Sequence, residues 1–197
     1  MFARMMLGLV LGVTALAGQS GNVDFRNFTY PFEKDPNGGS RARWRWMSKD
    51  IQTRITLAKG RYELEENDLA GGPYVTLAAV HYGEIIREKQ LDAIAVLHYE
   101  TGGTSSWDYL YIFDLSSTKP LLVNWLRTGE GGLNGLYGVE PAYLGFTLDL
   151  LDPEKASCHY CSSGFIRHTF TWTNGRFVQT GPLKYGRVED EPHPLRK

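Results

Sequence analysis

The chain has two cysteines, Cys158 and Cys161, and their spacing could serve three kinds of chemistry. A C-x-x-C pair can form a disulfide, act as a redox pair at the start of a helix, or supply two ligands to zinc. Residues 162–164 follow the pair without a helical pattern, which disfavours the redox pair. Zinc would need two more ligands, for which His159 and His168 are the nearest candidates. The sequence favours a structural disulfide that fixes a turn and leaves the other two chemistries as alternatives.

A second group could do acid–base or metal chemistry. His81 and His98 lie on two predicted strands, and Glu84, Glu88 and Asp92 lie in the connection between them. If the strands pair, the histidines could face each other near Glu84 or Asp92. A His81/Glu84/Asp92/His98 cluster would form the site of a hydrolase or a metal-dependent enzyme. Histidines on strands are more often single, hydrogen-bonded residues, so we keep this cluster as the alternative to a non-catalytic function.

An aromatic row is the strongest candidate for a binding surface. Trp107, Tyr109, Tyr111 and Phe113 alternate along one predicted strand and therefore share one of its faces. Exposed rings in such a row could stack on sugars or apolar ligands. The same pattern is also typical of a central strand whose rings form a core layer.

Alternation also organises the segment before residue 47. Trp44 and Trp46 share one strand face, and Arg41, Arg43 and Arg45 form a basic row on the other. A solvated edge strand explains this row better than anion recognition does, since charges on an edge discourage strand pairing.

Several common catalytic and cofactor motifs are missing from the sequence. It contains no G-x-S-x-G nucleophile elbow, no phosphate-binding G-x-x-x-x-G-K-[ST] and no dinucleotide-binding G-x-G-x-x-G. The glycine-rich run 129–135 carries Glu130 instead of a lysine, so it would repel phosphate. We expect no cofactor, and we interpret 101–106 and 129–138 as loops that could contribute to binding.

The overall composition is that of an ordinary globular protein. Of 197 residues, 42% are hydrophobic and 13% aromatic, and 21 Lys and Arg balance 22 Asp and Glu. A disordered chain would have fewer apolar residues, and a nucleic-acid binder usually has a basic excess. The composition therefore argues against both classes.

The first residues resemble an export signal. Arg4 precedes an apolar run over residues 5–17, which ends with the small residues Ala15 and Ala17. The run is shorter than the roughly 20 residues that a membrane span needs. We predict a signal peptide over 1–17 with cleavage near Gly18, no membrane anchor afterwards, and a periplasmic or secreted protein. An oxidising compartment would also favour the disulfide.

The remaining chain predicts one β-rich domain over 18–184 and a polar disordered tail over 185–197. Short apolar runs separated by turn residues indicate an antiparallel meander or sandwich-like sheet with at most short helices. A hairpin of 55–57 and 62–64 is expected around Lys59-Gly60, a turn at Asn174-Gly175, and a short helix over 83–91. The predicted strands are 23–30, 74–82, 93–99, 107–115, 121–126, 144–150, 165–172 and 176–178.

Two stretches of the chain resemble a known group of proteins. The segment 80–113 and the later segments 158–165 and 171–177 are similar to a group of uncharacterised bacterial exported proteins. In that group a strand leads into an acidic loop of the form D-x-T-G-D-G-x-x-E-A, like the calcium loops of integrin-type repeats, and a cysteine pair precedes a final hairpin. The resemblance implies a fold and brings no established activity.

The acidic loop of this chain departs from that pattern. Glu84, Glu88 and Asp92 stand where the acids would be, but Ile86 replaces an oxygen-bearing residue and Lys89 replaces the turn glycine. Calcium needs several oxygens and a sharp turn. These three acids are therefore weak metal candidates, and we expect no metal. The sequence favours a non-catalytic exported protein that binds a small molecule, a glycan or an envelope protein.

Overall fold

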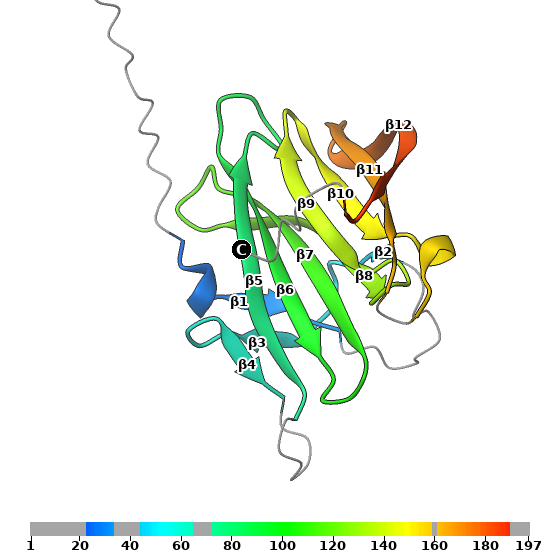
Figure 1. The fold of residues 1–197 in the computed structure, drawn as a ribbon. Coiled ribbons are helices and arrows are strands. Elements are labelled where there is room, and N and C mark those ends of the chain that lie inside the picture. Colours follow the sequence, from blue (N-terminus) through cyan, green and yellow to red (C-terminus); the bar gives the residue numbers. More distant parts are fainter. Residues whose placement is uncertain (1–22, 34–43, 65–71, 159–160, 190–197) are drawn as a thin grey trace, which may run out of the picture.

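The computed structural model describes residues 23–33, 44–64, 72–158 and 161–189, which form a mainly-β fold (Figure 1). Every strand pair in these residues is antiparallel. The two helical segments are short 3₁₀ turns, η1 (Phe25–Asn27) and η2 (Pro153–Lys155). The prediction of an antiparallel β domain with at most short helices is confirmed. The predicted signal over 1–17, Arg41 and Arg43 lie outside the described residues.

The largest sheet has six strands in the order β2-β8-β7-β6-β5-β4. Its strands are β2 (Arg45–Trp46), β4 (Arg61–Glu63), β5 (Tyr74–Gly83), β6 (Asp92–Glu100), β7 (Ser106–Asp114) and β8 (Leu121–Glu130). Strands β5 to β8 follow one another in sequence and pair as neighbours. They form the meander that the evenly spaced apolar runs predict.

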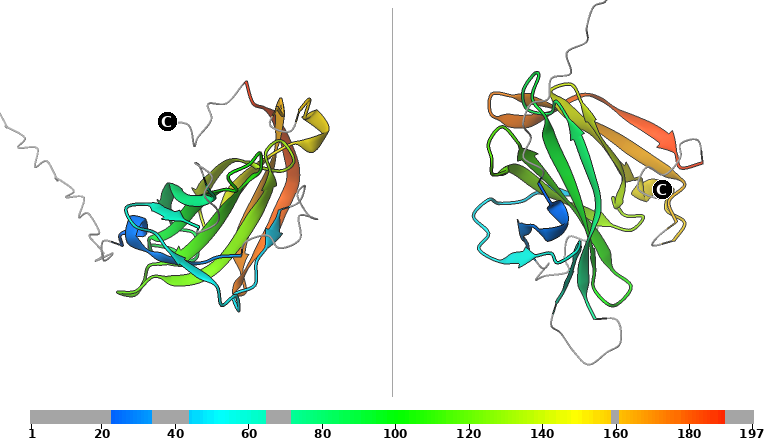
Figure 2. Two further views of the ribbon diagram at one scale, coloured as in Figure 1. Left: turned by 90° about the horizontal axis from the view of Figure 1, so that it is seen from below. Right: turned by 90° about the vertical axis from the view of Figure 1, so that its left-hand side faces the viewer.

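Two smaller sheets cover the six-stranded sheet (Figure 2). The second sheet has four consecutive strands, β9 (Leu136–Ala142), β10 (Gly145–Leu151), β11 (Gly164–Thr173) and β12 (Arg176–Arg187). The third pairs β1 (Thr29–Pro31) with β3 (Arg54–Thr56). The strands thus divide among three sheets, because residues 23–33 and 54–57 pack on one face of the meander and strands β9 to β12 pack on the other.

The six-stranded sheet separates two hydrophobic cores because its central strands are apolar on both faces. In β7, Tyr109, Tyr111 and Phe113 point into the first core. The N-terminal segment, residues 23–33, covers this core. Leu110 and Ile112 point into the second core, which the four-stranded sheet covers. Burying apolar residues on both faces gives this sheet the role of a central layer.

The four-stranded sheet lies close to one end of the six-stranded sheet. A Cβ atom on Gly83, at the end of β5, would lie 2.6 Å from the Cβ atom of Pro141 in β9, so the approach depends on glycine. At the opposite end of β6 and β7 the apolar side chains of the second core give way to the polar residues His98, Glu100 and Asp108.

Both predicted turns are present. Asn174 and Gly175 have φ values of 50° and 79° and connect β11 to β12, as an Asn-Gly hairpin turn requires. Lys59 and Gly60 have φ values of 55° and 88° between the bridged residues Ala58 and Arg61. This second turn connects two different sheets, since β3 pairs with β1 and β4 pairs with β5, so the predicted hairpin of 55–57 with 62–64 does not form.

Two predicted elements are wrong. Residues 83–91 form bends instead of a short helix, because backbone N–H groups of the loop bind the carboxylate of Asp92. The predicted strand 23–30 begins instead with η1, where the Asp24 carboxylate accepts a hydrogen bond from the N–H of Arg26 over 3.0 Å.

The predicted domain end at residue 184 also lies too early. Strand β12 continues to Arg187, and its ladder with β11 places Tyr185 opposite Ile166 and Arg187 opposite Gly164. The segment lacks apolar alternation because it is an exposed edge strand, so its order comes from backbone pairing and not from burial. Residues 190–197 of the predicted tail lie outside the described residues.

Candidate functional site

The four aromatic residues proposed as a binding face lie in the first core. Their exposed fractions are 6% for Trp107, 0% for Tyr109, 0% for Tyr111 and 2% for Phe113. The hydroxyl groups of Tyr109 and Tyr111 each donate a hydrogen bond of 2.8 Å, to the backbone carbonyls of Glu33 and Pro31 respectively. These rings therefore hold the N-terminal segment on the sheet. The prediction of a binding face is wrong. The four rings form a core layer, because β7 is a central strand covered on both sides.

The two tryptophans at β2 are also packing residues. Trp44 and Trp46 lie with their ring centroids 5.7 and 5.6 Å from that of Phe170, so they close the side of the second core. Arg45 points the other way, and its guanidinium lies 3.3 Å from the Glu33 carboxylate. Of the predicted basic row, Arg45 alone lies within the described residues, and its side chain is engaged in this ion pair.

The two histidines of the enzyme alternative lie at separate places. In the β5–β6 ladder His81 is opposite Ile94, whereas His98 is opposite Thr76. Positions 94 and 98 are about 13 Å apart along β6 at roughly 3.3 Å per residue. Burial lowers the pKa of the His81 imidazole below its usual value. The predicted cluster of both histidines with an acid is therefore not assembled.

Asp92 has a structural role at the far end of β6 from His98. It is fully buried, and its Oδ2 accepts hydrogen bonds from the N–H groups of Ile85 and Ile86 over 3.1 and 2.7 Å. Burial raises the pKa of its carboxyl group above the usual value, while these two hydrogen bonds favour the ionised form. Asp92 thus anchors the connection between β5 and β6.

The other two acids of this connection, Glu84 and Glu88, do not join Asp92. Glu84 is exposed, and Glu88 accepts a hydrogen bond from the hydroxyl of Tyr143. Lys89 has a φ of 57°, so it takes the left-handed conformation that a calcium loop gives to glycine. No group of three or more His, Cys, Asp or Glu side chains in the described part of the chain is placed to hold a metal ion.

His98 instead joins two acids that the sequence-based cluster did not include. Its Nδ1 lies 2.7 Å from Oδ1 of Asp108 and its Nε2 lies 2.8 Å from Oε1 of Glu100. The hydrogen bond with Asp108, helped by Glu100, raises the pKa of His98 to about 9, although burial opposes this shift. The imidazole is therefore protonated at neutral pH and forms an ion-pair network, which suits it poorly to act as a general base.

The two expected binding loops are tight turns. In the first, the hydroxyl of Thr101 donates a hydrogen bond of 2.9 Å to the carbonyl of Ser105. In the second, a Cβ atom on Gly129 would lie 2.0 Å from the carbonyl oxygen of Leu133, and Gly129 is buried. The glycines of this run serve close backbone packing, so it does not form an open binding loop.

Cys158 and Cys161 form the predicted disulfide, and the described residues contain no free cysteine. Their Cα atoms are 4.8 Å apart, within the range that a disulfide bridges. The bond closes the tip of the connection between η2 and β11. At its base, the Ser162 hydroxyl lies 2.8 Å from the carbonyl oxygens of both Asp152 and Gly164, either of which can accept its proton.

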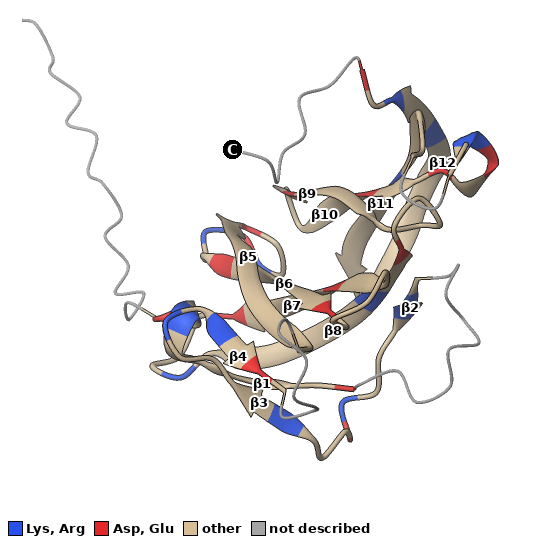
Figure 3. Cartoon of the chain, turned by 60° about the horizontal axis from the view of Figure 1, so that its bottom comes forward, with Lys and Arg blue, Asp and Glu red and all other residues tan. Residues whose placement is uncertain are grey.

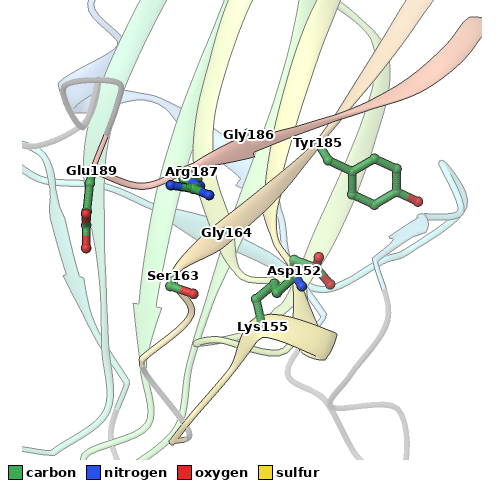
Figure 4. Close-up of a pocket in the computed structure, with 8 residues that line it drawn as sticks. All are labelled: Asp152, Lys155, Ser163, Gly164, Tyr185, Gly186, Arg187 and Glu189. Atoms are coloured by element: carbon green, nitrogen blue, oxygen red, sulfur yellow. The ribbon is translucent and has the colours of Figure 1, made fainter.

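A pocket of about 370 Å³ lies beside the base of this disulfide loop (Figure 4). Three segments build it: η2 with the residue before it, the start of β11, and the end of β12. Its lining residues are Asp152, Lys155, Ser163, Gly164, Tyr185, Gly186, Arg187 and Glu189. The volume falls in the range of roughly 300–1,000 Å³ that is typical of small-molecule sites.

The segments around the pocket are held by backbone hydrogen bonds. The N–H of Asp152 donates to the carbonyl of Gly164 over 2.9 Å, and the N–H of Val188 donates to the carbonyl of Ser163 over 3.1 Å. At Gly186 an added Cβ would lie 2.2 Å from the ring of Phe165, so a larger residue there would have to displace that ring. The pocket is therefore framed by paired strand ends.

Lys155 and Arg187 bring two cations to this pocket, and Asp152 and Glu189 bring two carboxylates. No hydrogen bond or ion pair within the described ranges engages the side chain of Lys155 or of Arg187. Asp152 is nearly buried, and its Oδ1 accepts a hydrogen bond of 2.9 Å from the N–H of Glu154. The pocket can therefore offer donors and acceptors of both signs to a ligand.

No sequence motif marks this pocket. Its charged residues come from two separate places in the chain, Asp152 with Lys155 and Arg187 with Glu189, and the second pair falls in the segment that was predicted as a disordered tail. The cysteine pair was the one local signal close to it.

Comparisons with protein-family models, with curated proteins and with solved structures each give no match to this chain. Of the helical segments that the structure describes, none has the length and apolar character that crossing a membrane would require.

Proposed function

We propose that this chain is an exported, non-catalytic β protein that binds a small polar ligand in the pocket beside the disulfide loop. The observation that carries the proposal is the pocket itself, which is lined by two cations, Lys155 on η2 and Arg187 at the end of β12, whose side chains make no hydrogen bond or ion pair within the described residues. A pocket with a few convergent polar groups is the usual place for a ligand.

The separation of the predicted catalytic residues supports a non-catalytic function. His81 and His98 lie at different positions along the sheet, Asp92 anchors a backbone loop, and His98 is held as a cation between two acids. Charged residues of both signs are interspersed over the molecule (Figure 3), which fits a ligand-binding protein better than a binder of polyanions.

Export is supported by two independent features. The signal pattern over residues 1–17 predicts cleavage near Gly18, and the disulfide is of the kind that persists in oxidising compartments. Expression of the full chain in a bacterium and sequencing of the mature N-terminus tests this part. Recovery of an intact N-terminus in the cytoplasmic fraction would refute export.

Ligand binding is tested with small probes of different charge, measured by calorimetry and by chemical shifts in NMR. The probes are glucose, lactate, ethanolamine and the dipeptide Ala-Ala. We expect at least one probe to bind the unaltered protein and to lose binding in Ser163→Trp, which fills the pocket from an exposed lining position.

The matched control is Thr173→Trp, an equally large change at an exposed residue at the other end of β11. It should leave binding unchanged. If no probe binds at millimolar concentration, or if Ser163→Trp binds as well as the control, the pocket is not a ligand site and the proposal fails.

A further inference from the structure

The lining of the pocket contains charges of both signs in equal number. Lys155 and Arg187 are cationic, and Asp152 and Glu189 are anionic. No ion pair within 4 Å joins a cation of this set to an acid in the part of the chain that the structure describes. A ligand that carries both charges could pair with both kinds of side chain.

The charged groups flank the backbone of Gly164, where the stem of Lys155 packs so closely that an added Cβ would lie 3.1 Å from its Cγ atom. Figure 4 shows Arg187 and Glu189 on one side, Asp152 and Lys155 on the other, and the strand segment of Gly164 between them. Gly164 lies opposite Arg187 in the β11–β12 ladder. A ligand resting on this glycine backbone would have a cation and a carboxylate within reach at either side.

The size of the pocket limits the ligand to a small molecule. A volume of about 370 Å³ is at the lower end of the range for ligand sites, large enough for an amino acid or a dipeptide. The exposed ring of Tyr185 at the border adds an apolar surface on which an aliphatic side chain or peptide plane could rest.

We propose that the pocket binds a small zwitterion of the amino-acid or dipeptide class, with its carboxylate held by Arg187 and its ammonium group held by Glu189. This inference rests on the proposed function, because it names the ligand class of the same site. The planar guanidinium of an arginine matches a carboxylate with two parallel hydrogen bonds, and Lys155 adds a second positive charge. A carboxylate accepts hydrogen bonds from an ammonium group in the same way.

The test compares three related ligands that carry different terminal charges. Ala-Ala has both charges, N-acetyl-Ala-Ala lacks the ammonium group, and Ala-Ala amide lacks the carboxylate. Calorimetry on the oxidised protein should show that each neutralised ligand binds at least about 10-fold more weakly than Ala-Ala, as expected for the loss of a charged hydrogen bond.

Two variants assign the roles of the side chains. Arg187→Gln should weaken Ala-Ala binding about 10- to 100-fold and make binding insensitive to amidation of the carboxylate. Glu189→Gln should weaken it about 10-fold and make binding insensitive to acetylation. The matched controls are Arg176→Gln at the exposed start of β12 and Glu154→Gln on η2, neither of which lines the pocket.

The outcomes separate this inference from the proposed function. If glucose, lactate or ethanolamine binds and Ser163→Trp abolishes that binding, while Ala-Ala does not bind, the pocket is a ligand site and the zwitterion class is wrong. If N-acetyl-Ala-Ala binds as well as Ala-Ala, or if both variants behave like their controls, the assigned roles are wrong. If none of the probes binds, both proposals fail.

Discussion

Replacing His98 by Gln should remove a pH-dependent contribution to the stability of the fold. The interaction with Asp108 and Glu100 raises the pKa of His98 from 6.5 to about 9. At about 1.4 kcal/mol for each pH unit the full effect would be about 3 kcal/mol. The imidazole side chain is 32% exposed, and screening by solvent reduces the contribution to about 1–2 kcal/mol.

The sign of the pH dependence follows from the protonation of the two states. In the unfolded chain His98 loses its proton near pH 6.5, whereas in the folded chain it keeps the proton up to about pH 9. The stabilisation is therefore fully present below pH 6.5, decreases between pH 6.5 and 9, and is absent above pH 9. His98→Gln should be less stable than the unaltered protein below pH 6.5 and should not show this decrease.

The assay is urea unfolding at pH values from 5.5 to 9.5. His81→Gln is the matched control, because burial lowers the pKa of His81 and its removal cannot abolish a decrease above pH 6.5. Equal free energies of unfolding for the unaltered protein and His98→Gln across the range would refute the reasoning. A decrease in the free energy of unfolding of the same size in the unaltered protein and in His98→Gln between pH 6.5 and 9 would also refute it.

Four further changes test the packing and the loops by urea unfolding at pH 7. Gly145→Ala should destabilise the fold by about 3 kcal/mol, because its Cβ would lie 2.0 Å from a carbonyl oxygen of β11, and an unchanged midpoint would contradict this close approach. Trp46→Ala should cost about 3 kcal/mol by emptying the side of the second core, whereas a loss below 1 kcal/mol would mean that the ring contributes little. Asp92→Ala should cost about 2 kcal/mol and Asp92→Asn clearly less, because only Asn keeps an oxygen for the two N–H groups; equal losses would rule out this anchoring role. The double change of Cys158 and Cys161 to Ser should cost about 2 kcal/mol relative to the oxidised protein, with the serine variant insensitive to reductant as the control.

Most strands of the two large sheets could be predicted because their signal is local, but β9 (Leu136–Ala142) was missed and its start was interpreted as part of a loop over 129–138. Alternating apolar residues mark β7 and β11, and the Asn174-Gly175 pair marks the turn that follows β11. The end of β12 could not be predicted in this way, since that edge strand is ordered by backbone pairing with β11 and carries mostly exposed side chains.

The candidate sites also divide into features that local sequence indicates and features that depend on contacts between distant segments. His98 and Glu100 share one strand face, which the sequence indicates, but the match with Asp108 depends on the register of β6 against β7. The alternation of Tyr111 with Leu110 and Ile112 is the same whether its ring faces a ligand or a core, so the sequence pattern does not distinguish the two. The burial of Tyr111 depends on the N-terminal segment, which packs on the same face of the sheet although it lies about 80 residues away in the chain.

The sequence by itself determined that this protein is an antiparallel β fold and where most of its strands lie, and it favoured a disulfide between its two cysteines. Those properties follow from side-chain alternation, turn residues and short spacing, which act between near neighbours. Only the tertiary structure decided which polar and aromatic residues are available for function. It buried the aromatic row, separated the two histidines and brought Lys155, Ser163 and Arg187 around one pocket. These outcomes depend on how the sheets stack and in which register they pair, and contacts between distant segments set both.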